Sequence, residues 1–591
     1  MKRNILKWLW VVSGRGKLYV AGLLLAQILN GASGVTYSMI LRGLVDAAAA
    51  HEPDGLRHYV ILLILLVTAQ ITVRAVIRWL EELSRATLEN RFKERLLSNI
   101  LSRDFAAVNA VHSGEWLNRL TGDCMIVANH FTDILPGLSG MTVRLFGAVI
   151  MIIILEPRFA AFMLPAGVLL LILATAFRKK IKKLHKRIQE ADGRLRIFLQ
   201  ERIGSLMMIR SFAAEPQTAE DAEEKLRAHK AARMRRNRFA NFCNIGFQSG
   251  MEGMYLFGAC WCVWGIYKET ISFGTMTAMT QLISQIQSPF ANITGYLPRF
   301  YAMTASAERL AEIEDFADDI GEAPKTPAEI QTYYREEFAA LRLSDVSFTY
   351  LPASDTVKQQ DKSAMPAVLR HLDLTLKKGE YAAFTGHSGC GKSTVLKLLS
   401  GVYRPDAGEC LLVSQSGAEI PAGSAWRRLF AYVPQGNQLM SGTIRGIVSF
   451  ADPAAAQDEA RLARALRIAC AADFVAELEQ GADTVLGERG TGLSEGQMQR
   501  IAIARAVFAD CPVMLLDEAT SALDEATERQ VLQNLREMTD KTVLIVTHRP
   551  AALSICDRVI AFTEQGAADI PPQSDLKTAS YTKMKDRKQA L

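Results

Sequence analysis

Six long apolar stretches mark the first half of the chain. They begin near Tyr19, Tyr59, Ile134, Phe159, Phe239 and Ile271. A helix needs about 20 mostly apolar residues to cross the hydrocarbon core of a bilayer. Each stretch meets this length, although the first and last are interrupted by Gly, Ser, Thr and Gln. The pattern predicts six membrane-spanning helices.

Two of the connections between these stretches are long and charged. They lie between the second and third stretches and between the fourth and fifth, and both have a helical pattern without clusters of Gly or Pro. A flexible loop has a different composition. We therefore expect the membrane helices to continue far beyond the bilayer on that side.

The pattern changes after residue 315. A polar linker containing Pro324 and Pro327 is followed by short β-like runs that alternate with helical segments. Such alternation is typical of an α/β domain. The predicted organisation is a six-helix transmembrane domain over 1–315, a linker over 316–337, an α/β domain over 338–570 and a tail over 571–591.

Composition agrees with a chain made of two unlike parts. The 591 residues exceed one ordinary domain, and 49% of them are hydrophobic. The mean hydropathy of +0.09 lies between values typical of soluble and of wholly membrane-embedded chains. Nine cysteines are scattered without a CxxC pair or a Cys/His cluster. This spacing indicates neither a disulfide framework nor a structural metal.

Basic residues predict the orientation in the membrane. Lys and Arg are concentrated at the N-terminus and in the two long connections, and are few in the short ones. An excess of Lys and Arg marks the cytoplasmic side. We expect a multi-pass protein of the cell (inner, cytoplasmic) membrane with both termini and the α/β domain in the cytosol. We interpret the basic runs as faces beside anionic membrane lipid, and expect no nucleic-acid partner.

Polar side chains recur at helical spacing on the last two stretches. Residues three, four or seven positions apart share one face of a helix. Such side chains are costly in hydrocarbon, and usually face a bundle interior or a watery cavity. Hydrogen bonds between neighbouring helices are the other interpretation, which stays open for the amides; for Glu252 we favour a cavity or cargo role. The candidates for a substrate cavity are Gln248, Glu252, Gln281, Gln285 and Asn292.

A glycine-rich loop follows the β-like run 382–385. Its pattern is GxxxxGK[ST], between a strand and the helical segment VLKLLSGVY. Backbone N–H groups of such a loop surround phosphate oxygens, and glycine leaves room for their approach. Lys392 adds positive charge at the outer phosphates, and Ser393 can ligate Mg²⁺. The loop residues are Gly386, His387, Ser388, Gly389, Cys390, Gly391, Lys392, Ser393 and Thr394.

Two further apolar runs end in polar residues suited to phosphate chemistry. The run 513–516 ends in Asp517 and Glu518, and the run 543–546 is followed by Thr547 and His548. The first carboxylate can hold the magnesium shell, and the second can orient or deprotonate an attacking water. An isolated histidine is more often an ordinary core residue, but its place after this strand favours a catalytic role for His548.

Several motifs in the second half resemble those of the ABC transporter superfamily. The segment LSEGQ (493–497) is similar to the family's signature, which other P-loop ATPases lack. Gln435 in YVPQ resembles the Q-loop, SALD (521–524) the D-loop, TVLGERG (484–490) the exporter X-loop, and Tyr350 in VSFTY the aromatic residue that stacks on adenine. In the first half, GEWLNRLTGD (114–123) and ERIGSLMMIRSFAAE (201–215) resemble the two coupling segments of exporters.

The resemblance implies an exporter-type half-transporter, with ATP and Mg²⁺ as cofactors. ATP would lie between two nucleotide-binding domains, the glycine loop of one facing the Ser494 segment of the other, so a second half-transporter is needed. The implied catalytic residues are Glu518 as base and His548 at the γ-phosphate. Tyr350, Gln435, Ser494, Gly496, Gln497 and Asp524 are assigned to nucleotide binding, and Ser393, Gln435 and Asp517 to Mg²⁺.

Two departures from the family pattern accompany the resemblance. Position 495 is Glu where the family commonly has Gly, while the neighbouring Ser494 and Gly496 are retained. The polar segment 351–367 is longer than the family usually has after this tyrosine, and we interpret it as a surface insertion after Tyr350.

The fold expected is therefore an all-α six-helix transmembrane domain joined to an α/β P-loop ATPase domain, in a dimeric ABC exporter architecture. The expected function is ATP-driven export of an amphiphilic or hydrophobic substrate, a lipid, drug or peptide, by alternating access. A homodimer is favoured because every catalytic position is intact; the active half of a heterodimer is the alternative. An ATP-gated channel or regulator is a less favoured third interpretation, since gating needs binding more than hydrolysis. Fold and motifs do not identify the cargo.

Overall fold

The computed structural model describes residues 4–319, 323–351, 365–436, 439–487, 490, 492–563 and 566–570. Some helix positions within 168–182 and 288–294, together with residues 566 and 570, are described for their backbone alone. Most of the polar segment 351–367 and the whole tail 571–591 therefore lie outside the described residues. The chain divides into two compact units, Met1–Arg95 with Arg119–Ala311, and Leu96–Asn118 with Glu312–Leu591.

The first unit is helical, and it contains six helices of more than thirty residues among those described. This confirms the expected six-helix membrane domain. By length and composition, three described stretches are apolar enough to cross a membrane: Gly16–Ala49, Pro53–Ser102 and Ser113–Leu155. The helices are α1 (Ile5–Val12), α2 (Gly16–Ala49), α3 (Pro53–Ser102), α6 (Cys124–Leu155), α7 (Pro157–Gly204), α8 (Leu206–Ser211), α9 (Glu215–Tyr267) and α10 (Phe273–Glu312).

Glycines bring α2 and α6 into close contact. A Cβ on Gly31 would lie 2.5 Å from the carbonyl oxygen of Gly140, and a Cβ on Gly140 would lie 2.8 Å from that of Gln27. Larger side chains at these two positions would force the helices apart. Small residues allow this backbone approach in membrane helices, where packing replaces the hydrophobic effect between elements.

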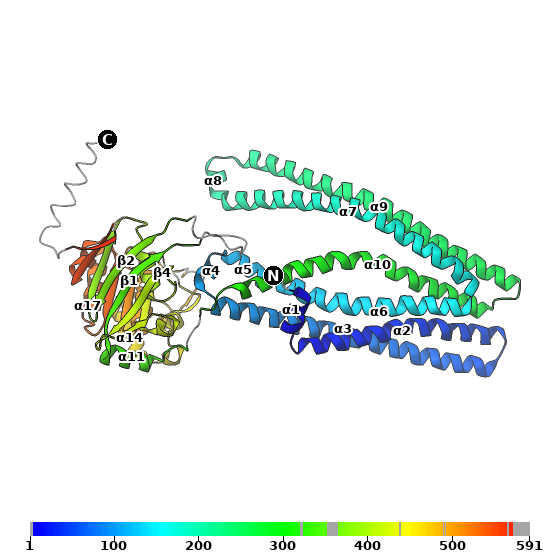
Figure 1. Cartoon of the computed structure of the whole chain (residues 1–591), viewed down its shortest axis with the longest axis horizontal. Helices are drawn as coiled ribbons and strands as arrows, with labels where there is room; N and C mark the ends of the chain where they lie inside the picture. The colour runs from blue at the N-terminus through cyan, green and yellow to red at the C-terminus, as the bar shows by residue number, and fades with distance from the viewer. Residues whose placement is uncertain are drawn as a thin grey trace. The chain divides into compact units, whose positions relative to one another are not determined.

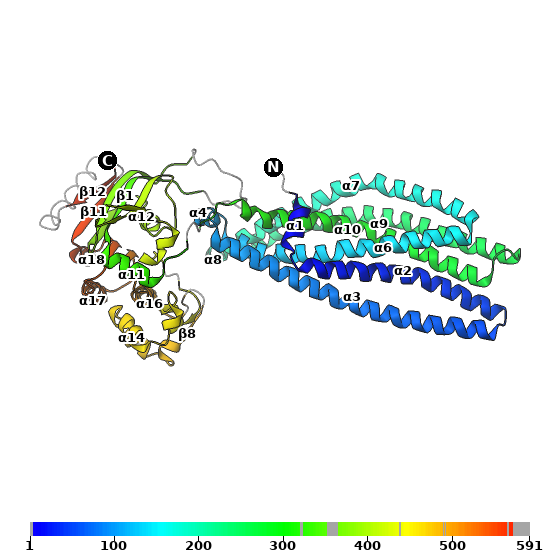
Figure 2. The same ribbon diagram turned by 60° about the horizontal axis from the view of Figure 1, so that its bottom comes forward.

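The helices α7 and α9 form a long antiparallel hairpin closed by the short helix α8, as both views show (Figures 1 and 2). At the other end of the hairpin, an apolar cluster joins these two helices to α6 and α10. Phe159, Cys262 and Met279 are fully buried in it. The hairpin therefore has its packed core at the end away from α8.

A buried ionic group fixes the start of α6 against the end of α10. Asp123 is 2% exposed, and it accepts hydrogen bonds from Ser306 Oγ (2.8 Å) and Arg309 Nε (2.7 Å). Arg119, which is 1% exposed, donates to the carbonyl oxygen of Arg309 at 2.7 Å. Both charges lie in the π-helical turn Arg119–Asp123 and its flank. Because buried charges need partners, this pairing holds the two helix ends together.

The second unit is an α/β domain, as the sequence predicts. Its larger sheet, among the described residues, has the strand order β12-β11-β3-β10-β9-β6, in which only β12 is antiparallel to its neighbour. A second, antiparallel sheet has the order β2-β1-β4-β5, and β7 and β8 form a small pair. The strands are β1 (Phe338–Phe348), β2 (Leu369–Lys377), β3 (Tyr381–Gly386), β4 (Ala407–Ser414), β5 (Glu419–Pro421), β6 (Phe430–Val433), β7 (Gly442–Thr443), β8 (Val485–Leu486), β9 (Val513–Asp517), β10 (Thr542–Val546), β11 (Arg558–Thr563) and β12 (Gly566–Ile570).

Two apolar clusters hold this domain together. One includes residues of both sheets and of the helix after the glycine loop, such as Phe348, Phe384 and Leu398. The other lies among the helices after β6 and includes Ile447, Leu462 and Ile503. The helices are α4 (Phe105–Asn109), α5 (Ser113–Asn118), α11 (Pro327–Glu336), α12 (Lys392–Leu399), α13 (Ile444–Val448), α14 (Glu459–Ile468), α15 (Ala472–Ala476), α16 (Glu495–Phe508), α17 (Glu525–Arg536) and α18 (Pro550–Ser554).

The linker contains a helix that the sequence analysis did not predict. α11 begins after Thr326, whose hydroxyl accepts from the Glu329 N–H while the Glu329 carboxylate accepts from the Thr326 N–H. This reciprocal pair is a capping box, and Pro327 occupies the first helical turn. The prolines that suggested a linker therefore also begin a helix.

Candidate functional site

The carboxyl ends of four parallel strands meet at one edge of the larger sheet. In the register, Val546 of β10 lies beside Asp517 of β9 and Phe384 of β3, and Val433 of β6 lies beside Leu516. Ligands of open α/β sheets bind outside this edge. The predicted loop, carboxylates and histidine all follow these strand ends directly.

The glycine loop between β3 and α12 requires its glycines. Gly386, Gly389 and Gly391 have φ of 138°, 84° and 97°, a region that other residues rarely adopt. A Cβ on Gly386 would lie 2.5 Å from the Phe562 carbonyl oxygen. The loop therefore presents its backbone N–H groups at the start of α12, where a helix favours an anion.

Lys392 lies inside this loop with only 6% of its surface exposed. Its Nζ donates to the carbonyl oxygens of Gly386 (2.8 Å) and His387 (2.9 Å), and lies 3.6 Å from Cys390 Sγ. The residues His387, Ser388 and Gly389 at the tip are exposed. A single cation held by loop carbonyls, beside exposed N–H groups, suits a phosphate ligand.

Asp517 at the end of β9 is a buried carboxylate with two hydroxyl partners. It is 1% exposed and accepts hydrogen bonds from Ser393 Oγ (2.9 Å) and Tyr432 OH (3.1 Å). Burial raises the pKa of Asp517, and these two hydrogen bonds oppose the rise. Ser393 and Asp517 thus lie together, as magnesium ligands of the predicted kind require.

Glu518, the predicted base, lies beside Gln435, a predicted magnesium ligand. Gln435 Nε2 donates to Glu518 Oε2 at 2.8 Å, joining the segment after β6 to the end of β9. Glu518 has φ of 50°, which is unusual for a residue with a side chain, and its N–H donates to the Val546 carbonyl oxygen at 3.1 Å. Strained backbone of this kind is frequent at functional positions. The turn directs the chain away from the strand immediately after Asp517.

The oxygen-rich chemistry of this edge fits Mg²⁺ bound together with phosphates. Mg²⁺ is usually held by one or two carboxylates plus substrate phosphates and water, not by a protein cage. In keeping with this, the described residues contain no cluster of three or more His, Cys, Asp or Glu side chains that could hold a metal alone. Ser393, Asp517 and Gln435 supply hydroxyl, carboxylate and amide oxygens.

Tyr350 packs beside the loop helix in a cluster of three aromatic rings. Its OH lies 2.9 Å from Thr394 Oγ1, and its ring centroid lies 4.9 Å from that of Phe348 and 5.5 Å from that of Tyr403. Tyr403 also contacts α4, which precedes the first predicted coupling segment (114–123): its ring lies 5.3 Å from that of Phe105, and its OH accepts from Asn109 Nδ2 at 3.2 Å. A direct series of contacts therefore joins α4 to the loop helix, and the sequence analysis had not identified Tyr403.

Ser494 and Gln497 form the N-terminal cap of α16. The Gln497 N–H donates to Ser494 Oγ (3.3 Å), and the Ser494 N–H donates to Gln497 Oε1 (2.8 Å). Ser494 itself is exposed. Further along α16, Gln499 Nε2 donates to Ser521 Oγ, and Gln499 Oε1 accepts from the Ala522 N–H, each at 2.9 Å. The signature segment is thus the exposed N-terminus of a helix that is hydrogen-bonded to the segment 521–524.

Arg549 joins that segment to the residues after β10. Its guanidinium donates to the carbonyl oxygens of Ser521 (2.6 Å) and Leu523 (2.8 Å) and to Glu528 Oε2 (2.9 Å). Asp524 caps α17 by accepting from the Thr527 N–H at 3.0 Å, while His548, beside Arg549, is exposed. The sequence analysis did not identify Arg549 or Glu528, because their pairing depends on long-range contacts.

The candidate cavity residues are not all brought together. On α9, Gln248 and Glu252 are exposed, and so is Gln281 on α10. Gln285 differs: its Nε2 donates to the Gly34 carbonyl oxygen (2.8 Å) and to Ser38 Oγ (3.0 Å) of α2. The side chain of Asn292 lies outside those described. Gln287, which the sequence analysis passed over, joins α10 to α9 through the Met251 carbonyl oxygen at 2.9 Å.

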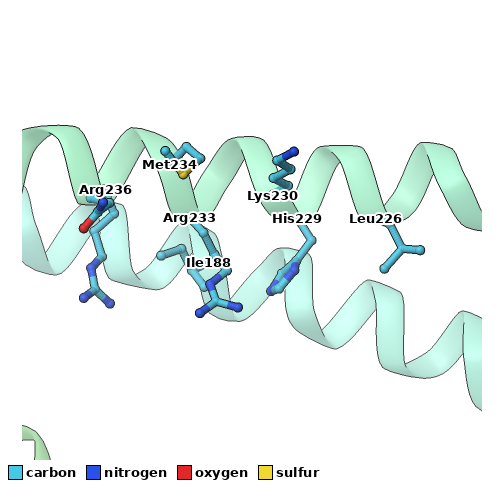
Figure 3. A pocket seen from close by; sticks show the side chains of 8 residues that line it. Ile188, Leu226, His229, Lys230, Arg233, Met234 and Arg236 are labelled. Atoms are coloured by element: carbon cyan, nitrogen blue, oxygen red, sulfur yellow. The ribbon is translucent and has the colours of Figure 1, made fainter.

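A cleft of about 640 Å³ opens between α7 and α9 beyond the apolar stretches. His229 of α9 and Ile188 of α7 lie between the two helices, and Arg233 and Arg236 of α9 extend toward the α7 side (Figure 3). Lys230 also lines the cleft, although most of its side chain points away from α7. His229 Nε2 lies 3.7 Å from Asp192 Oδ1. Apolar and basic side chains line this cleft together, and it lies on the charged connection that the sequence predicts to extend from the membrane.

Comparisons with known protein families cover both units. Residues 19–290 match the family model described as ABC transporter transmembrane region, and residues 369–521 match the model described as ABC transporter. Among solved structures, that of a bacterial Atm1-family ABC exporter with ATP bound has a similar fold. Its TM-score is 0.73 and its sequence identity 20%, over 97% of this chain and 99% of that one.

Curated relatives include several export proteins. The chain is 28% identical over 524 residues to ABC transporter B family member 1 of Dictyostelium discoideum, covering 88% of this chain and 55% of that one. It is 29% identical over 365 residues to the alpha-hemolysin translocation ATP-binding protein HlyB of Proteus vulgaris, covering 61% and 48%. The chain spans about half the length of the curated relatives it matches.

Proposed function

Because this chain belongs to the ABC transporter superfamily and joins an exporter-type membrane domain to an ATPase domain, we propose that it couples ATP hydrolysis to the export of an amphiphilic or hydrophobic substrate. The observation that carries the proposal is the edge of the larger sheet. There the glycine loop and Ser393, which follow β3, lie beside Asp517 and Glu518 at the end of β9. This is the constellation that phosphoryl transfer to water requires.

Each group has a defined task in this proposal. Lys392 and the loop N–H groups bind the outer phosphates, and Tyr350 stacks on adenine. Ser393, Asp517 and Gln435 hold Mg²⁺, which offsets negative charge on the phosphates. Glu518 orients and deprotonates the attacking water, and His548 contacts the γ-phosphate. The Glu518 carboxylate accepts a hydrogen bond from Gln435, one of the proposed magnesium ligands. A shift of Gln435 when Mg²⁺ binds would therefore also move the base.

A dimer follows from two exposed half-sites. The loop tip (His387–Gly389) and Ser494 are both exposed, and the hydrogen bonds of the signature helix described above run to the 521–524 segment, not to the loop. The helix α8 and its flank also expose Met207 (86%) and Phe212 (78%). Clustered exposed apolar side chains mark protein contacts. We therefore propose that a second half-transporter covers these surfaces, with a homodimer favoured over a heterodimer.

Coupling to transport uses the contacts of Tyr403. Since this ring touches both Tyr350 and the α4 residues Phe105 and Asn109, closure of the nucleotide site displaces the end of α3 through α4. ATP drives the change only through its higher affinity for the closed state. Hydrolysis removes the γ-phosphate contacts and restores the open state.

The experiment that tests the proposal measures transport and turnover together. Purified protein in inside-out liposomes is supplied with ATP outside and a panel of lipids, drugs and peptides. We expect ATP-dependent accumulation of at least one compound inside, abolished by Glu518→Gln. ATP-dependent ion conductance without accumulation would instead support the channel alternative. Full ATP turnover by unpaired subunits would contradict the shared site.

A further inference from the structure

Tyr432 lies at the sheet edge described above and has no task in the proposed reaction. It is the third of the four residues of β6 (Phe430–Val433). Its OH donates to Asp517 Oδ2 at 3.1 Å, while Ser393 Oγ donates to Asp517 Oδ1 at 2.9 Å. Each oxygen of this carboxylate therefore accepts from one hydroxyl group. Ser393 is itself a proposed magnesium ligand, but Tyr432 is not, so its hydrogen bond has a separate role.

The sheet places Tyr432 and Asp517 on the same face. Side chains alternate between the two faces along a strand. Tyr432 packs against the apolar cluster of the face that α12 covers, and Val513 and Leu515 of β9 belong to this cluster. Tyr432 lies beside Leu515 in the register, and Asp517 follows Leu515 by two residues. This offset is about 7 Å along the strand, a distance that a tyrosine side chain bridges with its hydroxyl group.

Asp517 is buried without a cationic partner. It is 1% exposed and forms no ion pair with any residue that the structure describes. Lys392 Nζ donates instead to the carbonyl oxygens of Gly386 and His387. An unpaired buried charge is costly, and two hydroxyl donors direct the carboxylate without neutralising its charge. The position therefore suits a cation that arrives with the nucleotide, as assigned above.

The two hydroxyl groups on Asp517 differ in how firmly they are held. Ser393 has a small side chain whose oxygen is assigned to Mg²⁺, whereas the ring of Tyr432 is packed against the core of the domain. A carboxylate oxygen has more than one acceptor position, so Oδ2 can keep this bond in the metal-loaded site. Partners that orient a ligating carboxylate matter, because their loss typically lowers metal affinity or activity about 10- to 100-fold.

We propose that Tyr432 is a positioning residue of the magnesium site, which holds the Asp517 carboxylate in the orientation that supports Mg²⁺. Gln435, three residues further along the same segment, donates to Glu518 at 2.8 Å. The end of β6 therefore contacts both carboxylates at the end of β9, one through a phenol and one through an amide. This inference rests on the magnesium site of the proposed function.

Binding of Mn²⁺ in place of Mg²⁺ tests the inference without turnover. The full chain in nanodiscs is saturated with AMP-PNP, a non-hydrolysable ATP analogue, and free Mn²⁺ is counted by electron paramagnetic resonance during a titration. We expect Tyr432→Phe, which keeps the ring and removes the hydroxyl group, to weaken Mn²⁺ binding about tenfold. Its affinity for AMP-PNP in EDTA should be unchanged. With ATP, it should need about tenfold more Mg²⁺ for the half-maximal rate and reach the wild-type kcat.

Tyr381→Phe is the matched control. Tyr381 is the first residue of β3, at the end of the strand away from the glycine loop. It is 2% exposed, and its OH donates to the carbonyl oxygens of Leu535 (2.7 Å) and Met538 (3.1 Å). Loss of this hydroxyl group leaves buried acceptors unpaired, so the Tm should fall while Mn²⁺ affinity stays unchanged. Asp517→Asn, as the second comparison, should weaken Mn²⁺ binding at least as much as Tyr432→Phe.

The comparison variants separate failure of this inference from failure of the magnesium site itself. Unchanged Mn²⁺ affinity in Tyr432→Phe, with weaker binding in Asp517→Asn, would overturn the inference and leave the magnesium site. Unchanged affinity in both variants would remove Asp517 from that site, and the inference with it. Equal weakening in Tyr381→Phe would show that any lost hydroxyl group in this sheet has the same effect. A fall in the kcat of Tyr432→Phe that added Mg²⁺ does not restore would also contradict a positioning role.

Discussion

The polar groups at the sheet edge of the ATPase unit and those at the contact of α2 with α6 and α10 in the membrane unit differ in how they are hydrogen-bonded. At the sheet edge of the ATPase unit, Asp517 has two hydroxyl partners and Glu518 has an amide partner. In the membrane unit, Arg144 Nε and Gln285 Oε1 are buried without a hydrogen-bond partner among the described residues. A site for a ligand common to a whole superfamily is thus assembled by contacts within the chain.

The largest expected effect comes from removing the base in the assembled site. Glu518→Gln keeps the shape and can still contact Gln435, but the side chain no longer accepts a proton. We expect ATP turnover to fall by about a hundredfold or more, as for the loss of a general base, while ATP binding persists. Steady-state turnover and nucleotide binding are measured side by side. Glu525→Gln is the control, because Glu525 is exposed on α17 and pairs with Arg529 of the same helix; equal losses in both variants would contradict the assignment.

The next effect concerns the support behind the signature segment. In Arg549→Ala, Glu528 keeps its charge at 3% exposure and loses its cationic partner. An uncompensated buried charge costs about 3 kcal/mol, so the ATPase unit should unfold at lower denaturant concentration. Arg529→Ala, on the exposed face of the same region, should leave the midpoint unchanged. Adding Glu528→Gln to Arg549→Ala should recover part of the loss, and no recovery would mean that the charge pair is not the cause.

These groups also show what the sequence could and could not predict. Local patterns are enough for the glycine loop, for Asp517 and Glu518 at a strand end, and for the long helices, because each depends on neighbours in the chain. The partners of these groups come from distant segments, as Tyr432 and Arg549 do. The sequence analysis missed α11 because Pro324 and Pro327 were interpreted as part of a linker, although a proline such as Pro327 suits the first turn of a helix.

The polar residues of the membrane spans illustrate the same limit. Periodicity identified the stripes on α9 and α10 but gave equal weight to a cavity and to helix contacts. The structure favours a helix contact for Gln285, because its side chain bonds Gly34 and Ser38 of α2. These partners lie about 250 residues away in the sequence, so no local pattern contains them.

A pH experiment sharpens the comparison at Asp517. Burial raises the pKa of this carboxyl group, so the folded protein binds more protons there than the unfolded chain does. Its contribution to stability is therefore lost as pH rises through the raised pKa. We expect magnesium-free Asp517→Asn to have a higher Tm than the wild type at pH 8, with the gap closing as pH falls through that pKa. Thermal unfolding across this range is the measurement.

Asp524→Asn is the contrast for that experiment. The Thr527 N–H lowers the pKa of Asp524, so its ionised form stabilises the fold at neutral pH. Substitution there should not raise the Tm at pH 8. A Tm gain of equal size in both variants, or a gain in Asp517→Asn that does not change with pH, would show that the buried charge is not responsible.

The smallest expected effect is a change in stability at Gln285, and it tests whether this amide joins two helices or lines a substrate cavity. Gln285→Leu removes two hydrogen bonds from α10 to α2, and hydrogen bonds between membrane helices contribute about 0.6 kcal/mol each. We expect a loss of about 1 kcal/mol in the stability of the reconstituted protein, measured by denaturation in mixed micelles. Gln281→Leu, one turn away and exposed, should leave stability unchanged. If instead both variants keep full stability and both weaken cargo binding, Gln285 belongs to the cavity with Gln281, and its bonds to Gly34 and Ser38 contribute little to holding the helices together.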